Sequence, residues 1–193
     1  MGLNPQSPFK DGNIIEAKLL LEKACEEAGI SLQTLNQLRL SYPSSDRAHR
    51  IAQVLQQQWL ENLGLRITLE PLEPKVYFSQ VAHKNFDLAI ASWFADFNDP
   101  INFLEVYRTS SHLSNRTAYE DPEMEQLINL SYREKDPAAR LQILSLAEKK
   151  LLDGMPIIPL SHASLIYVKN EMVHDVVLSG TGEIDFKWAY IDD

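Results

Sequence analysis

The fold class is decided between residues 38 and 93, which read LRLSYPSSDRAHRIAQVLQQQWLENLGLRITLEPLEPKVYFSQVAHKNFDLAIASW. Short runs of strand-forming residues alternate here with segments whose apolar residues recur at helical spacing. In chain order, the predicted elements are a strand at 38–42, a helix ending at Leu63, a strand at 65–70, a helix at 74–83 and a strand at 86–93. This alternation is typical of parallel strands joined by right-handed crossovers. The sequence therefore predicts an α/β fold, with a parallel-rich sheet flanked by helices.

The flanking segments indicate a helix before this stretch and a mostly helical half after it. The first helix is predicted at 13–28, where Gly29 is a natural stop. Asp-Pro pairs precede three further helical patterns, and Asp can cap the open amides while Pro fits the first turn. These patterns predict helices at 100–108, 122–133 and 137–153, then extended segments at 157–160, 165–168 and 184–190. The expected organisation is a C-terminal helical half with an extended tail.

Composition excludes several classes of protein. The 193 residues carry 18 basic and 27 acidic side chains, and the resulting net charge of −9 argues against a nucleic-acid-binding surface. The single Cys25 cannot form an internal disulfide, and no apolar run reaches the roughly 18 residues of a membrane span. The polar start of the chain lacks the basic and apolar regions of a signal peptide, so none is predicted in this chain. Residues 1–12 are expected to be disordered.

The densest group of chemically informative residues is WFADFNDP at 93–100, directly after the third predicted strand. Ligands of open α/β sheets bind at the carboxyl ends of the strands. A carboxylate among aromatic rings suits an ammonium group, because a charge-assisted hydrogen bond and the ring faces both favour positive charge. Residue types alone leave two other interpretations open. Asp96 could be a solvated loop carboxylate with Trp93 in the core, or Asp96 and Asp99 could be a hydrolytic acid–base pair.

Signals for other chemistry are weak. The sequence contains no glycine-rich nucleotide loop and no nucleophile elbow. Its histidines show no metal-ligand spacing, so no metal site is predicted. The five are His49, His83, His112, His162 and His174.

The segment at 93–100 resembles the "W-x-A-D-Y-x-D/E-P" motif of peptide-binding proteins of ABC importers, the oligopeptide/dipeptide-binding type, with Phe97 in the tyrosine place. Other segments are similar to the family's and follow in its order. They are EAKLL at 16–20 ahead of Ala28-Gly29, NLGL at 62–65, YEDPE at 119–123, PIIPL at 156–160 and DFKWAY at 185–190. The similarity extends from about residue 13 to residue 190.

This resemblance implies a periplasmic-binding-protein-like lobe of type II, in a two-lobe protein that closes on a peptide. The family's aspartate grips the α-amino group of the ligand and its tryptophan helps to wall the pocket, and the matching residues are Asp96 and Trp93. The predicted ligand-binding residues are Trp93, Phe94, Asp96, Phe97 and Asn98. The resemblance also implies no enzymatic activity and no cofactor. The intact protein is expected in the periplasm or cell envelope, with an ABC permease as partner.

Two departures from the family pattern shape these expectations. Family chains are far longer, so residues 1–193 are expected to be a single C-terminal lobe of a two-lobe protein. This lobe is either an engineered piece or a truncated paralogue. The N-terminal lobe is missing, and residues 155–193 are expected to return toward it. Some relatives carry an arginine where this chain has Ile90. The group that neutralises a ligand carboxylate is therefore open among Arg47, His49, Arg108 and Arg116. The alternative functions are a lobe for a nickel chelate or other non-peptide solute, and a paralogue acting as an interaction module.

Overall fold

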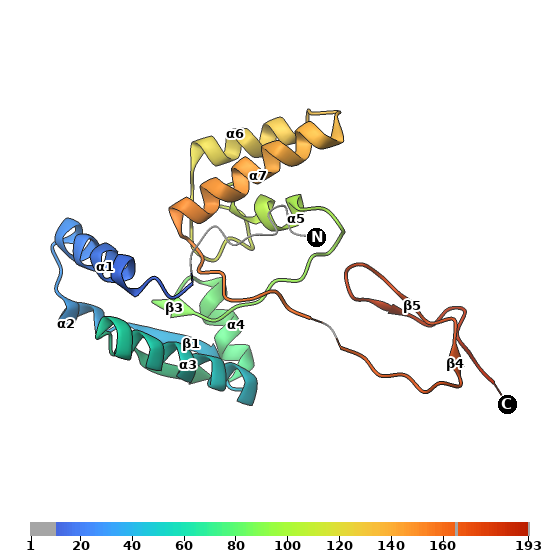
Figure 1. The fold of residues 1–193 in the computed structure, drawn as a ribbon, viewed down its shortest axis with the longest axis horizontal. Helices are drawn as coiled ribbons and strands as arrows, with labels where there is room; N and C mark the ends of the chain where they lie inside the picture. The colour runs from blue at the N-terminus through green and yellow to red at the C-terminus, as the bar shows by residue number, and fades with distance from the viewer. Residues whose placement is uncertain (1–10, 165, 193) are drawn as a thin grey trace. The chain divides into compact units, whose positions relative to one another are not determined.

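The computed structural model describes residues 11–164 and 166–192. These divide into two compact units, one ending at Ser92 and the other beginning at Trp93 (Figure 1). Residues 1–10, which hold most of the segment expected to be disordered, lie outside the described residues. Leu165, within the predicted extended segment 165–168, also lies outside them.

The unit that ends at Ser92 contains a three-stranded parallel sheet of order β2-β1-β3. The strands are β1 (Arg39–Pro43), β2 (Thr68–Leu72) and β3 (Leu88–Ala89), and the helices are α1 (Ile14–Ala28), α2 (Leu32–Leu35), α3 (Asp46–Leu63) and α4 (Pro74–Ala82). Parallel pairing with intervening helices confirms the predicted α/β class. Only α2 was not expected from the sequence.

Helix α3 packs on the sheet through an apolar face. Ser45 caps its first turn by accepting a hydrogen bond from the Ala48 amide, and Gly64 ends it with a left-handed φ of 72°. The buried core of this unit combines sheet and helix residues, because Leu40 and Tyr42 point to the same side of β1. Its members are Leu40, Tyr42, Ala48, Ala52 and Ile67.

The opposite side of β1 carries a polar network that joins β1 to β2 and to the residue before β3. Arg39 donates to Glu70 on β2 at 2.8 Å and lies 3.3 Å from Asp87, just before β3. Ser41, which is buried, donates to the other Glu70 oxygen at 2.6 Å. The strand register places these side chains together, since Arg39 pairs with Thr68 and Ser41 with Glu70.

The second and third strands differ most from the prediction. The third strand was predicted over 86–93, but only Leu88–Ala89 pair with β1, followed by a hydrogen bond from the Ile90 amide to the Ser41 carbonyl. The second strand was predicted to close at Pro71, which instead lies inside β2 opposite Tyr42. β2 tolerates this proline because it is an edge strand, where a missing N–H leaves no partner unsatisfied.

The unit that begins at Trp93 is built on a pair of helices, α6 (Pro122–Ser131) and α7 (Pro137–Gly154), with α5 (Ile101–Leu104) and the 3-10 turn η1 (Glu105–Tyr107) against them (Figure 1). Buried residues recur at helical spacing on the facing sides of these helices. They are Ile101, Leu104, Met124, Ile128, Leu144, Ala147 and Leu151. No helix in the described ranges has both the length and the apolar character needed to cross a bilayer.

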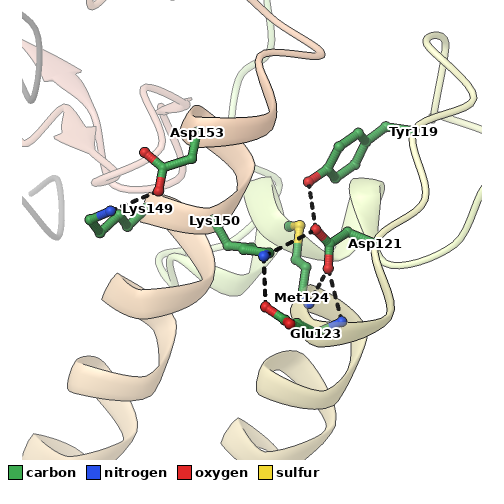
Figure 2. Close-up of polar contacts among 7 residues, drawn as sticks. All are labelled: Tyr119, Asp121, Glu123, Met124, Lys149, Lys150 and Asp153. Atoms are coloured by element: carbon green, nitrogen blue, oxygen red, sulfur yellow. Dashed lines mark hydrogen bonds and ion pairs between the residues drawn. The ribbon is translucent and has the colours of Figure 1, made fainter.

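Polar contacts fix the end of the pair where α6 begins and α7 ends (Figure 2). Asp121 caps α6 by accepting hydrogen bonds from the Glu123 and Met124 amides, as the Asp-Pro pattern predicts. Lys150 of α7 lies 2.6 Å from Glu123 and 3.6 Å from Asp121, so one cation bridges the two helices. Gly154 suits this end because a Cβ there would come within 2.6 Å of the Tyr119 hydroxyl.

The tail holds short antiparallel pairs in place of the continuous strand predicted at 184–190. β4 (Val173–His174) pairs with β7 (Tyr190–Ile191), and β5 (Val177–Leu178) pairs with β6 (Ile184–Asp185). A local turn separates β6 from β7, because Asp185 accepts a hydrogen bond from the Lys187 amide.

Candidate functional site

The site begins with the side chain of Asn102, in the first turn of α5. Asn102 is only 8% exposed, and its amide carbonyl oxygen accepts two hydrogen bonds. One comes from the Trp93 indole nitrogen at 3.2 Å and the other from the Asp96 backbone amide at 3.1 Å. The Asn102 amide nitrogen donates to one Asp96 carboxylate oxygen at 3.4 Å. One buried side chain therefore joins the tryptophan and the aspartate of the motif.

A second aspartate, Asp99, fastens the same loop to the helix pair. Its carboxylate accepts a hydrogen bond from the Ile101 amide at 2.9 Å, which satisfies an open amide at the start of α5. The Arg140 guanidinium of α7 donates to both Asp99 oxygens, at 2.8 and 3.1 Å. This two-pronged pair fixes geometry as well as charge. Asp99 is thus a structural anchor, and the pairing leaves little support for Asp96 and Asp99 as a hydrolytic acid–base pair.

The Asp99–Arg140 pair makes stability depend on pH. Burial raises the pKa of the Asp99 carboxyl, but hydrogen bonds from Arg140 and the Ile101 amide, with the charge of Arg140, outweigh it and hold the pKa below its ordinary value. The folded-state pKa therefore lies below the unfolded-state value of about 3.9. The stabilisation is complete above that value and is lost as the pH falls through the folded-state pKa.

We expect the stability difference between the native protein and an Asp99→Asn variant to shrink as the pH drops below about 4. Urea denaturation at a series of pH values measures this difference directly. Asp121, whose pKa is also lowered, is present in both proteins, so its contribution cancels. Parallel stability curves from about pH 5 to about pH 3 would contradict the assignment.

The Asp96 side chain lies at the surface and is not paired with a cation of the described chain. Asp96 is exposed, and no cationic side chain in the described ranges forms an ion pair with it. Among the described residues, Asn102 alone donates a hydrogen bond to this carboxylate, and it engages one of the two oxygens. The motif's aromatic side chains are about half exposed, at 45% for Trp93, 51% for Phe94 and 48% for Phe97. Trp93 is therefore not a core residue, and the three rings and the Asp96 carboxylate are exposed in the described structure.

The predicted site residues are brought together only in part. Trp93 and Asp96 share Asn102, whereas Phe94, Phe97 and Asn98 are neighbours in the chain without a hydrogen bond or ring contact to Asp96 in the described structure. Sequence reasoning missed Asn102. The available signal was an amide residue three positions after Asp99, in the first turn of a predicted helix.

The candidates for neutralising a ligand carboxylate differ in their surroundings. In the unit ending at Ser92, His49 contacts the Tyr42 hydroxyl at 2.7 Å and Arg47 is exposed on α3. In the other unit, the buried Nε of Arg108 has no hydrogen-bond partner among the described residues. The described residues contain no cluster of three or more His, Cys, Asp or Glu side chains suited to a metal ion.

The family model and the similar proteins point to the same family. Residues 2–115 match the family described as "Bacterial extracellular solute-binding proteins, family 5 Middle". The oligopeptide-binding protein OppA of Bacillus subtilis is 37% identical over 188 residues, which are 97% of this chain and 34% of OppA. The dipeptide-binding protein DppE of the same organism is 32% identical over 177 residues, covering 92% of this chain and 32% of DppE. The chain thus spans about a third of the length of these relatives.

A solved structure shows the same fold. The substrate-binding domain of an oligopeptide ABC transporter from Bacillus anthracis superposes with a TM-score of 0.78, covering 94% of this chain and 35% of that one. At 22% identity this likeness concerns the fold alone. It confirms the predicted periplasmic-binding-protein-like fold of type II. From the family match and the fold together, the chain belongs to the bacterial extracellular solute-binding proteins of family 5.

Proposed function

We propose that this chain supplies part of the ligand site of a peptide-binding protein that serves an ABC importer. The observation that carries the proposal is the Asp96 carboxylate, which is exposed, held by Asn102 and unpaired with any described cation. The relatives OppA and DppE are named for oligopeptide and dipeptide binding, which supports a peptide as the ligand.

In this proposal, Asp96 receives the α-ammonium group of the peptide. An ammonium group carries three donors and one positive charge, and the Asp96 oxygen that no described donor engages offers an acceptor of opposite charge. Trp93, Phe94 and Phe97 offer half-exposed ring faces that favour a nearby cation. Recognition of a terminus common to all peptides leaves ligand side chains free to vary, as broad capture requires. Asn98 completes the proposed set as a polar neighbour of these rings.

The proposal extends to the intact protein. The intact protein binds the peptide without chemical turnover, in the periplasm or cell envelope, and delivers it to an ABC permease. Residues 1–193 form one lobe, with 155–193 leading toward the remainder of the two-lobe protein. This extension draws on the relatives, whose length is about three times the matched span.

Calorimetric titration of the intact protein tests the ligand class. A series of unmodified di- to pentapeptides should release heat with saturable binding, whereas a nickel chelate should not. Mass spectrometry of the peptides after incubation should show them unchanged. Saturable binding of the nickel chelate without peptide binding would favour a non-peptide solute. Cleavage by the pure protein, absent from a heat-treated sample, would contradict a pure binding role.

A further inference from the structure

The motif loop contains two carboxylates that are held in different ways. Asp99 is paired with the Arg140 guanidinium, so its charge is neutralised within the protein. Asp96 is held by a neutral amide, which orients one oxygen and adds no opposing charge. We propose that Asn102 is a positioning residue, which sets the Trp93 ring and the Asp96 carboxylate in the arrangement that receives the ligand. The claim that this arrangement receives the ligand rests on the proposed function, whereas the claim that Asn102 positions Trp93 and Asp96 does not.

The hydrogen-bonding chemistry fixes the orientation of the Asn102 amide. The Trp93 indole N–H and the Asp96 backbone N–H can only donate, so the group that faces them must be the carbonyl oxygen. The amide nitrogen then faces Asp96, whose ionised carboxylate can only accept. A flipped amide would place donors against donors and a carbonyl oxygen against a carboxylate. The three contacts are therefore mutually consistent in one orientation only.

Burial makes this arrangement demanding. Asn102 is 8% exposed, so water does not readily replace a partner that is lost. The backbone of Asn102 is also held in place, because its amide donates a hydrogen bond to the Asp99 carbonyl at 3.1 Å and the Asp99 side chain is paired with Arg140. Arg140 of α7 thus holds Asp99, and Asp99 holds Asn102. Asn102 in turn contacts the Trp93 indole and the Asp96 carboxylate.

A second buried asparagine in the same unit provides a matched control. Asn115 is fully buried and also makes three side-chain contacts, donating to the Thr109 and Tyr119 carbonyls and accepting from the Thr117 hydroxyl. All of these contacts close the loop between η1 and α6, away from Trp93 and Asp96 in the hydrogen-bond network. Asn115→Ala should therefore lower stability without altering the motif.

The first test follows the Trp93 indole in the 193-residue chain by ¹H–¹⁵N NMR. The chain has three tryptophans, Trp59, Trp93 and Trp188, and loss of a cross-peak in Trp93→Phe assigns the resonance. The Trp93 cross-peak should move and exchange faster with solvent in Asn102→Ala. It should stay near its native position in Asn115→Ala, whose side-chain contacts involve neither Trp93 nor Asp96. An unmoved cross-peak in Asn102→Ala would overturn the proposal whatever the ligand is.

The second test measures the affinity of the intact protein for trialanine and for N-acetyl-trialanine. The preference for the free amino terminus should fall by about tenfold in Asn102→Ala, the effect of misplacing one polar contact. It should be unchanged in Asn115→Ala. Equal losses in both variants would reduce Asn102 to a structural role and overturn the proposal. If the native protein shows no preference between the two peptides, the proposed function fails, while the NMR result still decides the role of Asn102 within the chain.

Discussion

Asp96→Ala in the intact protein is expected to weaken the binding of peptides with a free amino terminus by about 2–5 kcal/mol, or at least about 25-fold. The reason is that the ligand ammonium loses its anionic partner while it is still withdrawn from water. Titration calorimetry with trialanine measures the change. High salt should reduce this loss of affinity less than it reduces the contribution of a surface ion pair, because the bound ligand shields the contact from ions in solution.

Three comparisons isolate the charge contact. N-acetyl-trialanine, which lacks the ammonium, should bind the native protein and Asp96→Ala with similar affinity, so the two changes are not additive. Asp96→Asn keeps the shape and an acceptor oxygen but loses the charge, and should fall between native and Ala. Glu125→Gln on α6 removes a carboxylate of the same unit outside the motif and should leave affinity unchanged. Equal weakening of both peptides by Asp96→Ala would remove Asp96 from the role of ammonium partner.

Leu144→Ala is expected to lower the free energy of unfolding by about 2–5 kcal/mol, the cost of removing a leucine side chain from a packed core. Leu144 is fully buried in α7 and belongs to the core that includes Met124 and Ile128 of α6. The cavity would lie one helical turn after Arg140, whose contact with Asp99 supports the motif. Urea denaturation, combined with hydrogen exchange of the α6 and α7 amides, measures the change.

Leu146→Ala is the matched control for this change. It is the same substitution on the same helix, but Leu146 is 56% exposed. Its effect on unfolding should stay within about 0.5 kcal/mol, because little apolar surface changes its environment. Similar losses from the two variants would show that the interior of this unit is not packed as the structure has it.

Local sequence signals predicted much of the fold because they act through neighbouring residues. Ser45 and Gly64 bound α3 at the residues where capping chemistry places its ends, and Asp121 and Asp136 do the same at the starts of α6 and α7. The alternation between 38 and 93 was enough to predict a parallel sheet, because a helix between two strands returns the chain to the same edge.

The features that the sequence did not reveal depend on long-range partners. Strand β3 ends at Ala89, where its pairing with β1 ends. The apolar pattern continues to Trp93, so the sequence alone does not show where this pairing stops. Asn102 was missed for a related reason. Its role depends on a loop that brings the indole of Trp93 and the amide of Asp96 to one oxygen, nine and six residues away in the chain. Asp99, in contrast, was correctly expected near a helix start, but its partner Arg140 lies 41 residues away.

The role of Asp96 as the partner of the peptide's amino terminus is tested most directly by the structure of the intact protein with trialanine bound. The peptide's terminal nitrogen should lie within hydrogen-bond distance, about 2.7–3.2 Å, of an Asp96 carboxylate oxygen, with Asn102 still hydrogen-bonded to Trp93 and Asp96. A bound peptide whose amino terminus contacts another carboxylate, with Asp96 left facing solvent, would contradict this role.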